Sequence, residues 1–188
     1  TFQIMDTGGW VPRSEELFDA AIREQVQFAL EECDLVLFAV DGQTGPTDTD
    51  LEIARMLQRG TRPVILVVNK VDNEQMALEV PAFYQMGLGD PMPMSATNGR
   101  GFAEILDEVL ARLPEKGKAE ELARPRPLIA VVGRPNVGKS SFVNAVLGQS
   151  RHLVTEIAGT TRDAIDTVIG YYQQPMTLID TAGLRRRS

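Results

Sequence analysis

The sequence predicts an α/β fold in which a mostly parallel sheet is covered by helices on both faces. Apolar residues form continuous runs at 35–40, 63–68 and 128–132, as is typical of strands that are buried on both sides. Amphipathic stretches separate such runs at the spacing of crossover connections. A glycine-bearing loop then joins the run at 128–132 to a helical pattern, which is a common place for a ligand site in this class of fold.

Composition favours a cytoplasmic protein. The 188 residues include one cysteine, Cys33, which excludes an internal disulfide framework and fits a reducing compartment. The sequence has no apolar run long enough to cross a bilayer, so no membrane partner is expected, and no signal peptide opens the chain. The oligomeric state is left open.

Charge is divided unevenly along the chain. The net charge is −7, with 8 basic and 19 acidic residues in 1–113, and 11 basic and 7 acidic residues in 114–188. The acidic part is a poor general binder of RNA, whereas the second part tolerates such a partner.

The elements of the first part follow in order. A short strand at 2–5 precedes a helix capped by Ser14, and the helix at about 48–59 is capped by Thr47 or Asp48. Helical patterns also occupy 74–87 and 102–113, with a strand at 91–94 between them. The apolar stripes of these helices are interpreted as core.

The first strand ends in an aspartate that is followed three residues later by a glycine. This arrangement suits a nucleotide switch, in which the carboxylate approaches magnesium through water and the glycine amide faces the terminal phosphate. Such a pattern is weak when it stands alone. The residues concerned are Asp6, Thr7, Gly8, Gly9 and Trp10.

A second polar segment ends the strand at 63–68. Here the Asp72 carboxylate can accept hydrogen bonds from N1–H and the exocyclic amine of guanine, which adenine does not offer. Asn69 is expected to hold the neighbouring loop and the base edge, and a backbone amide of Ser95, Ala96 or Thr97 to meet the guanine oxygen. The complete segment is Asn69, Lys70, Val71 and Asp72.

The loop after the strand at 128–132 matches Gly, four residues, Gly-Lys-Ser. Its glycines let backbone amides close around phosphate oxygens at the start of a helix, Lys139 reaches the outer phosphates, and the Ser140 hydroxyl ligates Mg²⁺. The loop consists of Gly133, Arg134, Pro135, Asn136, Val137, Gly138, Lys139 and Ser140.

Two further segments complete the expected site. The polar stretch 151–163 contains Thr161, whose hydroxyl is expected on Mg²⁺, and His152, which we interpret as an exposed loop residue. A hairpin at 164–179 then delivers a second switch segment, with Asp180 at the metal and Gly183 at the terminal phosphate. This segment is Asp180, Thr181, Ala182, Gly183 and Leu184.

With these motifs in place, the chain resembles the translation-factor-like P-loop GTPases, and more narrowly the bacterial tandem-domain GTPase family called Der or EngA. The resemblance covers essentially the whole chain. It implies a P-loop NTPase (Ras-like GTPase) fold, GTP or GDP with Mg²⁺ as ligands, GTP hydrolysis, and a role in assembly of the large ribosomal subunit with its RNA as partner.

Relative to that family pattern, the motifs are incomplete on each side. The switch pattern occurs at Asp6 and again at Asp180, so the first copy lacks a phosphate loop and the second lacks a guanine-reading segment. We therefore expect an internal fragment of a longer protein: 1–113 is the C-terminal part of one GTPase domain, 114–127 is a linker, and 128–188 is the N-terminal part of another.

The resemblance also bears on catalysis. Trp10 and Leu184 follow the switch glycines, where many GTPases carry a water-orienting glutamine, and neither can orient water by hydrogen bonding. GTPases of this type often recruit K⁺ through the asparagine at the position of Asn136. The implied catalytic residues are Lys139, Thr161, Gly183 and Asn136.

Two other functions and one structural hypothesis stay open at this point. The chain could be a nucleotide-gated module that binds RNA or the ribosome, or a circularly permuted single GTPase. Because each half alone leaves strands unpaired, we hypothesise that the strand at 128–132 pairs beside 35–40, which brings Lys139 and Asp72 to one composite site. The strand at 1–5 would then be displaced or added at an edge.

Overall fold

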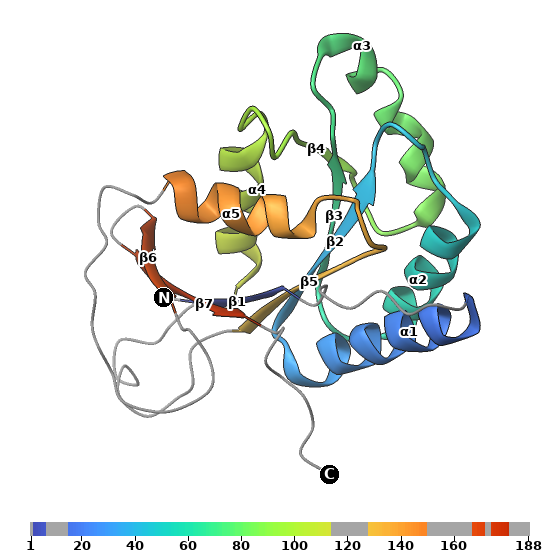
Figure 1. The fold of residues 1–188 in the computed structure, drawn as a ribbon, viewed down its shortest axis with the longest axis horizontal. Helices are drawn as coiled ribbons and strands as arrows, with labels where there is room; N and C mark the ends of the chain where they lie inside the picture. Colours follow the sequence, from blue (N-terminus) through green and yellow to red (C-terminus); the bar gives the residue numbers. More distant parts are fainter. Residues whose placement is uncertain (1, 7–14, 114–127, 150–166, 172–173, 181–188) are drawn as a thin grey trace.

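The computed structural model describes residues 2–6, 15–113, 128–149, 167–171 and 174–180. Their strands form a single seven-stranded sheet of order β4-β3-β2-β5-β1-β7-β6 (Figure 1). Every neighbouring pair is parallel except β6 and β7, which are antiparallel. The strands are β1 Phe2–Asp6, β2 Leu35–Asp41, β3 Val64–Asn69, β4 Met92–Pro93, β5 Leu128–Val132, β6 Thr167–Tyr171 and β7 Gln174–Asp180. The predicted α/β class is confirmed.

Helices cover both faces of this sheet (Figure 1). Buried side chains of α4 and α5 pack on one face, and those of α1, α2 and η1 pack on the other. The helices are α1 Glu15–Glu32, α2 Asp48–Arg59, α3 Glu74–Ala77, the 3-10 helix η1 Val80–Met86, α4 Phe102–Arg112 and α5 Lys139–Gln149. Among the described residues, no helix has the length and apolar character needed to span a membrane.

Strand β2 shows why the apolar runs are continuous. Leu37 and Ala39 belong to the core on the α4/α5 face, whereas Val36 and Phe38 belong to the core on the α1/α2 face. Successive side chains of a strand point to opposite faces, so a central strand of a sheet covered on both faces must be apolar at every position.

Strand β5 lies between the two inner strands of the first part. It pairs with β2 through Leu35 and Ile129, and with β1 through Met5 and Ala130. The hypothesis that 128–132 pairs beside 35–40 is confirmed, and the described residues from both sides of the 114–127 segment build one sheet.

The expected fate of the first strand was wrong. β1 is neither displaced nor at an edge, since it pairs with β5 on one side and β7 on the other, and Ile4 is buried. The added element is β7, which brings its antiparallel partner β6 to the outside of β1. A hairpin can join a sheet as a unit because its two strands already form backbone hydrogen bonds with each other along their facing edges.

Two predicted elements are shorter than expected. The helical stretch 74–87 divides into α3 and η1, because Pro81 has no amide hydrogen with which to continue the α-helical pattern. The strand at 91–94 contains two paired residues, since Pro91 and Pro93 limit the ladder that can form there. The parallel strands β3 and β4 still place residues 69–72 and 95–96 at the carboxyl edge of the sheet.

Candidate nucleotide site

The phosphate loop leaves β5 tightly against the end of β2. A Cβ at Gly133 would lie 2.2 Å from the carbonyl oxygen of Ala39, and the φ of Gly133 is 147°. Only glycine tolerates both conditions. Asn136, with φ 64°, turns the loop in the left-handed region, where asparagine is among the better tolerated side chains. The backbone therefore forms the narrow cradle that phosphate binding requires.

Lys139 begins α5 and is 5% exposed. Its Nζ donates to the carbonyl oxygens of Gly133 and Arg134, each at 2.8 Å. In this structure the ammonium group thus donates hydrogen bonds to the first two residues of the phosphate loop. It lies at the helix N-terminus, where a bound phosphate also gains from the helix dipole.

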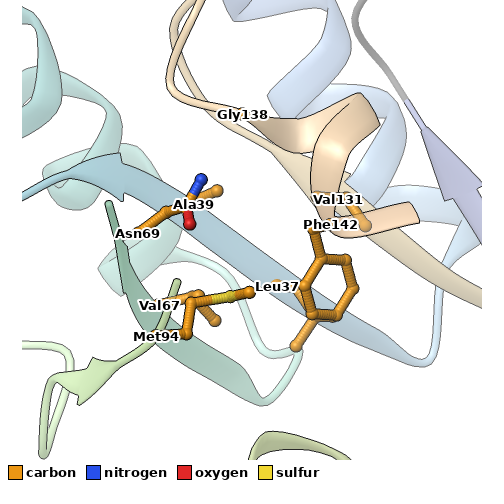
Figure 2. A pocket seen from close by; sticks show the side chains of 8 residues that line it. All are labelled: Leu37, Ala39, Val67, Asn69, Met94, Val131, Gly138 and Phe142. Carbon is orange, nitrogen blue, oxygen red and sulfur yellow. The ribbon is translucent and has the colours of Figure 1, made fainter. Parts of the chain in front are cut away.

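Asn69 joins the guanine-reading segment to the phosphate loop. Its Nδ2 donates to the carbonyl oxygen of Val137 at 2.7 Å, and its Oδ1 accepts from the amide of Ala96 at 3.0 Å. Figure 2 shows this side chain extending from the end of β3 on the side of Gly138. A Cβ at Gly138 would lie 2.2 Å from Asn69 Nδ2, so this glycine leaves the space that the contact needs. One buried side chain thereby connects three loops.

Asp72 lies at the exposed end of the same segment. Its Oδ1 accepts a hydrogen bond from Ser95 Oγ at 2.6 Å, and Asn98 Nδ2 donates to its backbone carbonyl at 3.3 Å. These bonds hold the carboxylate at the carboxyl edge while leaving it accessible to a ligand.

The structure alters two expectations about this side of the site. The amide of Ser95 donates to the carbonyl of Arg100, and that of Ala96 donates to Asn69, so both expected contacts to a guanine oxygen are used within the protein. Lys70, at φ 67°, pairs its Nζ with Asp41 Oδ2 at 2.6 Å. Ser95, Ala96 and Lys70 therefore help to hold the loop in this structure.

The two switch aspartates stand side by side in the backbone register. Asp6 pairs with Val131 of β5 and also with Asp180 of β7. Asp6 is thus in the strand next to the phosphate-loop strand, whereas Asp180 is one strand further away. The sheet order disagrees with our expectation that Asp180 serves the metal beside Ser140.

Several expected site residues lie outside the described residues. They are Thr7, Gly8, Gly9, Trp10, Thr161, Thr181, Ala182, Gly183 and Leu184, together with His152 and the segment 114–127.

The sequence analysis missed one contact within the site. Arg134, which we expected to contact nucleotide, directs Nε to Asp50 Oδ1 at 2.7 Å. Asp50 also completes a capping box with Thr47 at the start of α2. The Thr-x-x-Asp pattern predicts such a box, but no local pattern predicts its arginine partner.

A small cavity lies beneath the phosphate loop (Figure 2). Its volume is about 10 Å³, and most of its lining is apolar, with Leu37, Met94 and Phe142 among the contributors. This space is about that of one water molecule, so it is not the nucleotide site. Among the described residues no group of three His, Cys, Asp or Glu side chains could hold a metal by itself. Mg²⁺ here would need phosphate oxygens as well as Ser140.

Comparisons with known proteins agree with this geometry. A family model described as "50S ribosome-binding GTPase" matches residues 1–70 and 128–188. A GTPase Der from Clostridium novyi is 48% identical over 187 residues, covering 100% of this chain and 42% of the relative. A GTPase Der from Porphyromonas gingivalis is 48% identical over 186 residues, covering 99% of this chain and 43% of the relative.

The chain thus spans less than half the length of these curated relatives. The family match falls into two blocks, and these same blocks supply every strand of the sheet except β4. The matched blocks cover most of the chain and contain the phosphate loop, Asn69 and both switch aspartates. This chain therefore belongs to the family of 50S ribosome-binding GTPases.

Proposed function

We propose that this chain binds one guanine nucleotide at a composite site, and that the protein of which this fold is the nucleotide-binding part hydrolyses GTP. The observation that carries the proposal is the 2.7 Å hydrogen bond from Asn69 to the Val137 carbonyl. This contact unites the base-reading segment of β3 with the phosphate loop after β5. A purely structural asparagine would not need to meet a phosphate-binding pattern.

The phosphate side supplies backbone amides, Lys139 and the Ser140 hydroxyl. Glycine at 133 and 138 lets the loop backbone pack closely against the Ala39 carbonyl and the Asn69 side chain, since a Cβ at either position would lie 2.2 Å from one of their atoms. In such a tight turn, successive backbone amides can face phosphate oxygens. Mg²⁺, when bound with nucleotide, would neutralise phosphate charge and polarise the phosphoryl group. Ser140 would hold it directly, and we assign the water-mediated carboxylate to Asp6, because Asp6 lies in the strand adjacent to β5.

The base side would select guanine through Asp72. A carboxylate accepts two hydrogen bonds from guanine, whereas adenine presents an acceptor at N1 and no amine at C2. The bond from Ser95 Oγ orients this carboxylate, and Asn69 anchors the loop. Asn136 is exposed at the loop tip and is our proposed contact for K⁺. Thr161 keeps its proposed catalytic role in the hydrolysing protein, and Gly9, three residues after Asp6, takes the role at the terminal phosphate that was expected of Gly183.

The family description supports a ribosomal role. We propose that the intact protein acts in the cytoplasm in assembly of the large ribosomal subunit, with guanine nucleotide controlling its binding to the subunit or its RNA. Measuring subunit binding in GTP and in GDP, in parallel with turnover, tests this role. Equal affinity for the subunit in GTP and in GDP would contradict this role.

Calorimetric titration of the 188-residue chain with GDP and Mg²⁺ tests the composite site. We expect one GDP per chain, no comparable binding of ADP, and loss of binding in Lys139→Ala. Asp72→Asn should weaken GDP by at least about tenfold, because a buried or oriented charged hydrogen-bond partner contributes on the order of 1.5–3 kcal/mol. Unchanged affinity in Asp72→Asn, or a folded chain without GDP binding, would refute the assignment.

A further inference from the structure

We propose that Arg134 and Asp50 form a positioning pair, which sets the resting geometry of the phosphate loop from the start of α2. The proposal deepens the proposed function, because it names residues that tune the same site without contacting its ligand. It begins with the burial of Asp50, whose relative exposure is 0%. A buried carboxylate must be paired and hydrogen bonded to be tolerated.

The Asp50 carboxylate has partners on both oxygens. Oδ1 accepts from Arg134 Nε at 2.7 Å, while Oδ2 accepts from Thr47 Oγ1 at 2.7 Å and from the Thr47 amide at 3.1 Å. Thr47 Oγ1 in turn accepts from the Asp50 amide at 3.3 Å. The cap of α2 and the guanidinium group are therefore parts of one hydrogen-bond network.

Arg134 carries this network into the phosphate loop. Its side chain is tied to Asp50, and its own backbone carbonyl accepts the hydrogen bond from Lys139 Nζ at 2.8 Å. The residue that α2 anchors is thus the residue that holds the phosphate-binding lysine. A displacement of Arg134 must move the lysine or break this bond.

The anchoring element is itself well packed and capped. Helix α2 buries Ile53, Ala54 and Leu57 against the sheet, and its first turn is closed by the capping box. A guanidinium group held by a rigid carboxylate loses little conformational freedom when the loop binds a ligand, because the geometry is already set. The pair would therefore favour binding of the phosphate groups and leave base recognition by Asp72 unaffected.

The chain offers a matched control. Arg23 also pairs with a carboxylate of α2, Glu52, but at 3.8 Å and with side-chain exposures of 63% and 56%. Arg23→Ala, in α1, removes the same charge from a pair with a carboxylate of the same helix α2, and it leaves the phosphate loop untouched. It should change neither nucleotide binding nor the loop.

Calorimetry with GDP and with guanosine separates a positioning role from a general loss of structure. In Arg134→Ala we expect GDP affinity to fall by roughly tenfold or more, as for a small misplacement of a binding group. Guanosine affinity should be preserved, and Arg134→Lys should restore part of the loss. If Arg134→Ala folds poorly, Asp50→Asn takes its place, because it keeps hydrogen-bonding groups in the cap. It should show the same loss of GDP affinity with guanosine affinity preserved.

Amide hydrogen exchange across 136–140 provides a readout in the nucleotide-free chain, so it remains decisive even if the proposed GDP binding fails. Exchange should accelerate at least about tenfold in Arg134→Ala, since a local contact has been lost, and stay at the wild-type rate in Arg23→Ala. Equal loss of GDP and guanosine, or wild-type exchange in folded Arg134→Ala, would overturn the positioning role.

Discussion

Strands β1 and β7 end in the same way but occupy different places in the sheet. Both lead into an Asp-x-x-Gly sequence, and Asp6 and Asp180 are aligned in parallel register. Of these two strands, β1 pairs directly with β5, whereas β7 pairs with β1 and with the outer strand β6. A motif therefore does not decide which copy serves a site. The position of its strand relative to the phosphate-loop strand decides it.

Core packing should show the largest difference between these strands. Ile4 of β1 is 1% exposed and belongs to the core beneath α4 and α5. Ile4→Ala should lower the free energy of unfolding by about 3 kcal/mol, as for other buried aliphatic truncations. Leu178→Ala, at the paired position in β7, should cost less than half as much, because β7 lies next to an edge strand.

Urea denaturation followed by circular dichroism measures both values. A single cooperative transition is expected for each variant, since one sheet contains all of the described strands. Two separate transitions, with only one shifted by Ile4→Ala, would show that the halves fold independently and would break the comparison.

The aspartates themselves should differ in magnesium-dependent chemistry. Asp6→Asn is expected to lower GTP turnover by about a hundredfold, the scale of losing one electrostatic contact to a reacting phosphoryl group. Asp180→Asn should change turnover by less than about threefold, the scale of a loss of under 1 kcal/mol. GDP affinity measured without Mg²⁺ serves as the control, and it should be similar in both variants. The reverse order of effects would assign the phosphate loop to the second switch strand.

Asn69 tests the contact between the end of β3 and the phosphate loop that follows β5. Asn69→Ala removes the bonds to the Val137 carbonyl and the Ala96 amide, and leaves buried polar groups without these partners. We expect a loss of about 2 kcal/mol in unfolding free energy, accompanied by weaker GDP binding. Thermal and calorimetric measurements on the same samples check both effects.

The neighbouring residue Asn73 provides the comparison for this variant. Asn73 caps α3 by accepting from the Met76 amide, on the exposed side of the segment. Asn73→Ala should cost about 1 kcal/mol or less and should leave GDP affinity at the wild-type value. If both variants reduced GDP affinity equally, Asn69 would have no special role at the phosphate loop.

The smallest expected effect concerns the reactivity of the Cys33 thiol. This residue lies away from both switch strands and so serves as a reference for them. Burial, with the negative charge of Asp34 adding to it, raises the pKa of the Cys33 thiol to about 12. The folded thiol should therefore react very slowly with iodoacetamide at pH 8, because the thiolate is the nucleophile. Rapid alkylation of the native chain would show that this side of the core opens.

The same shift has a defined consequence for stability. The thiol favours its protonated form in the folded state, so its contribution is complete at pH values where the unfolded thiol is still protonated, and it is lost as the pH rises from there towards 12. In a comparison with Cys33→Ala, the difference in unfolding free energy should stay constant up to about pH 8 and then change as the unfolded thiol ionises, near its ordinary pKa of about 8.5.

Local sequence patterns determined most elements and both binding loops. The uninterrupted apolar runs predicted the central strands, because strands covered on both faces need apolar residues at every position. Thr47 or Asp48 was predicted to cap α2, and Thr47 is the observed cap. The glycines at 133 and 138 predicted a tight phosphate cradle. These features depend on interactions within a few residues, which is why they could be read from the chain itself.

The tertiary structure alone decided which distant residues meet. The pairing of β5 beside β2 was hypothesised from the sequence, but the retention of β1 inside the sheet, on the other side of β5, was not. Nor could the 2.7 Å contacts of Asn69 with Val137 and of Arg134 with Asp50 be found locally, since they join residues 68 and 84 positions apart. Hydrogen bonds of this kind follow from strand order and burial. Strand order and burial are set only when the whole sheet has paired the backbone groups of its strand edges and covered both of its apolar faces.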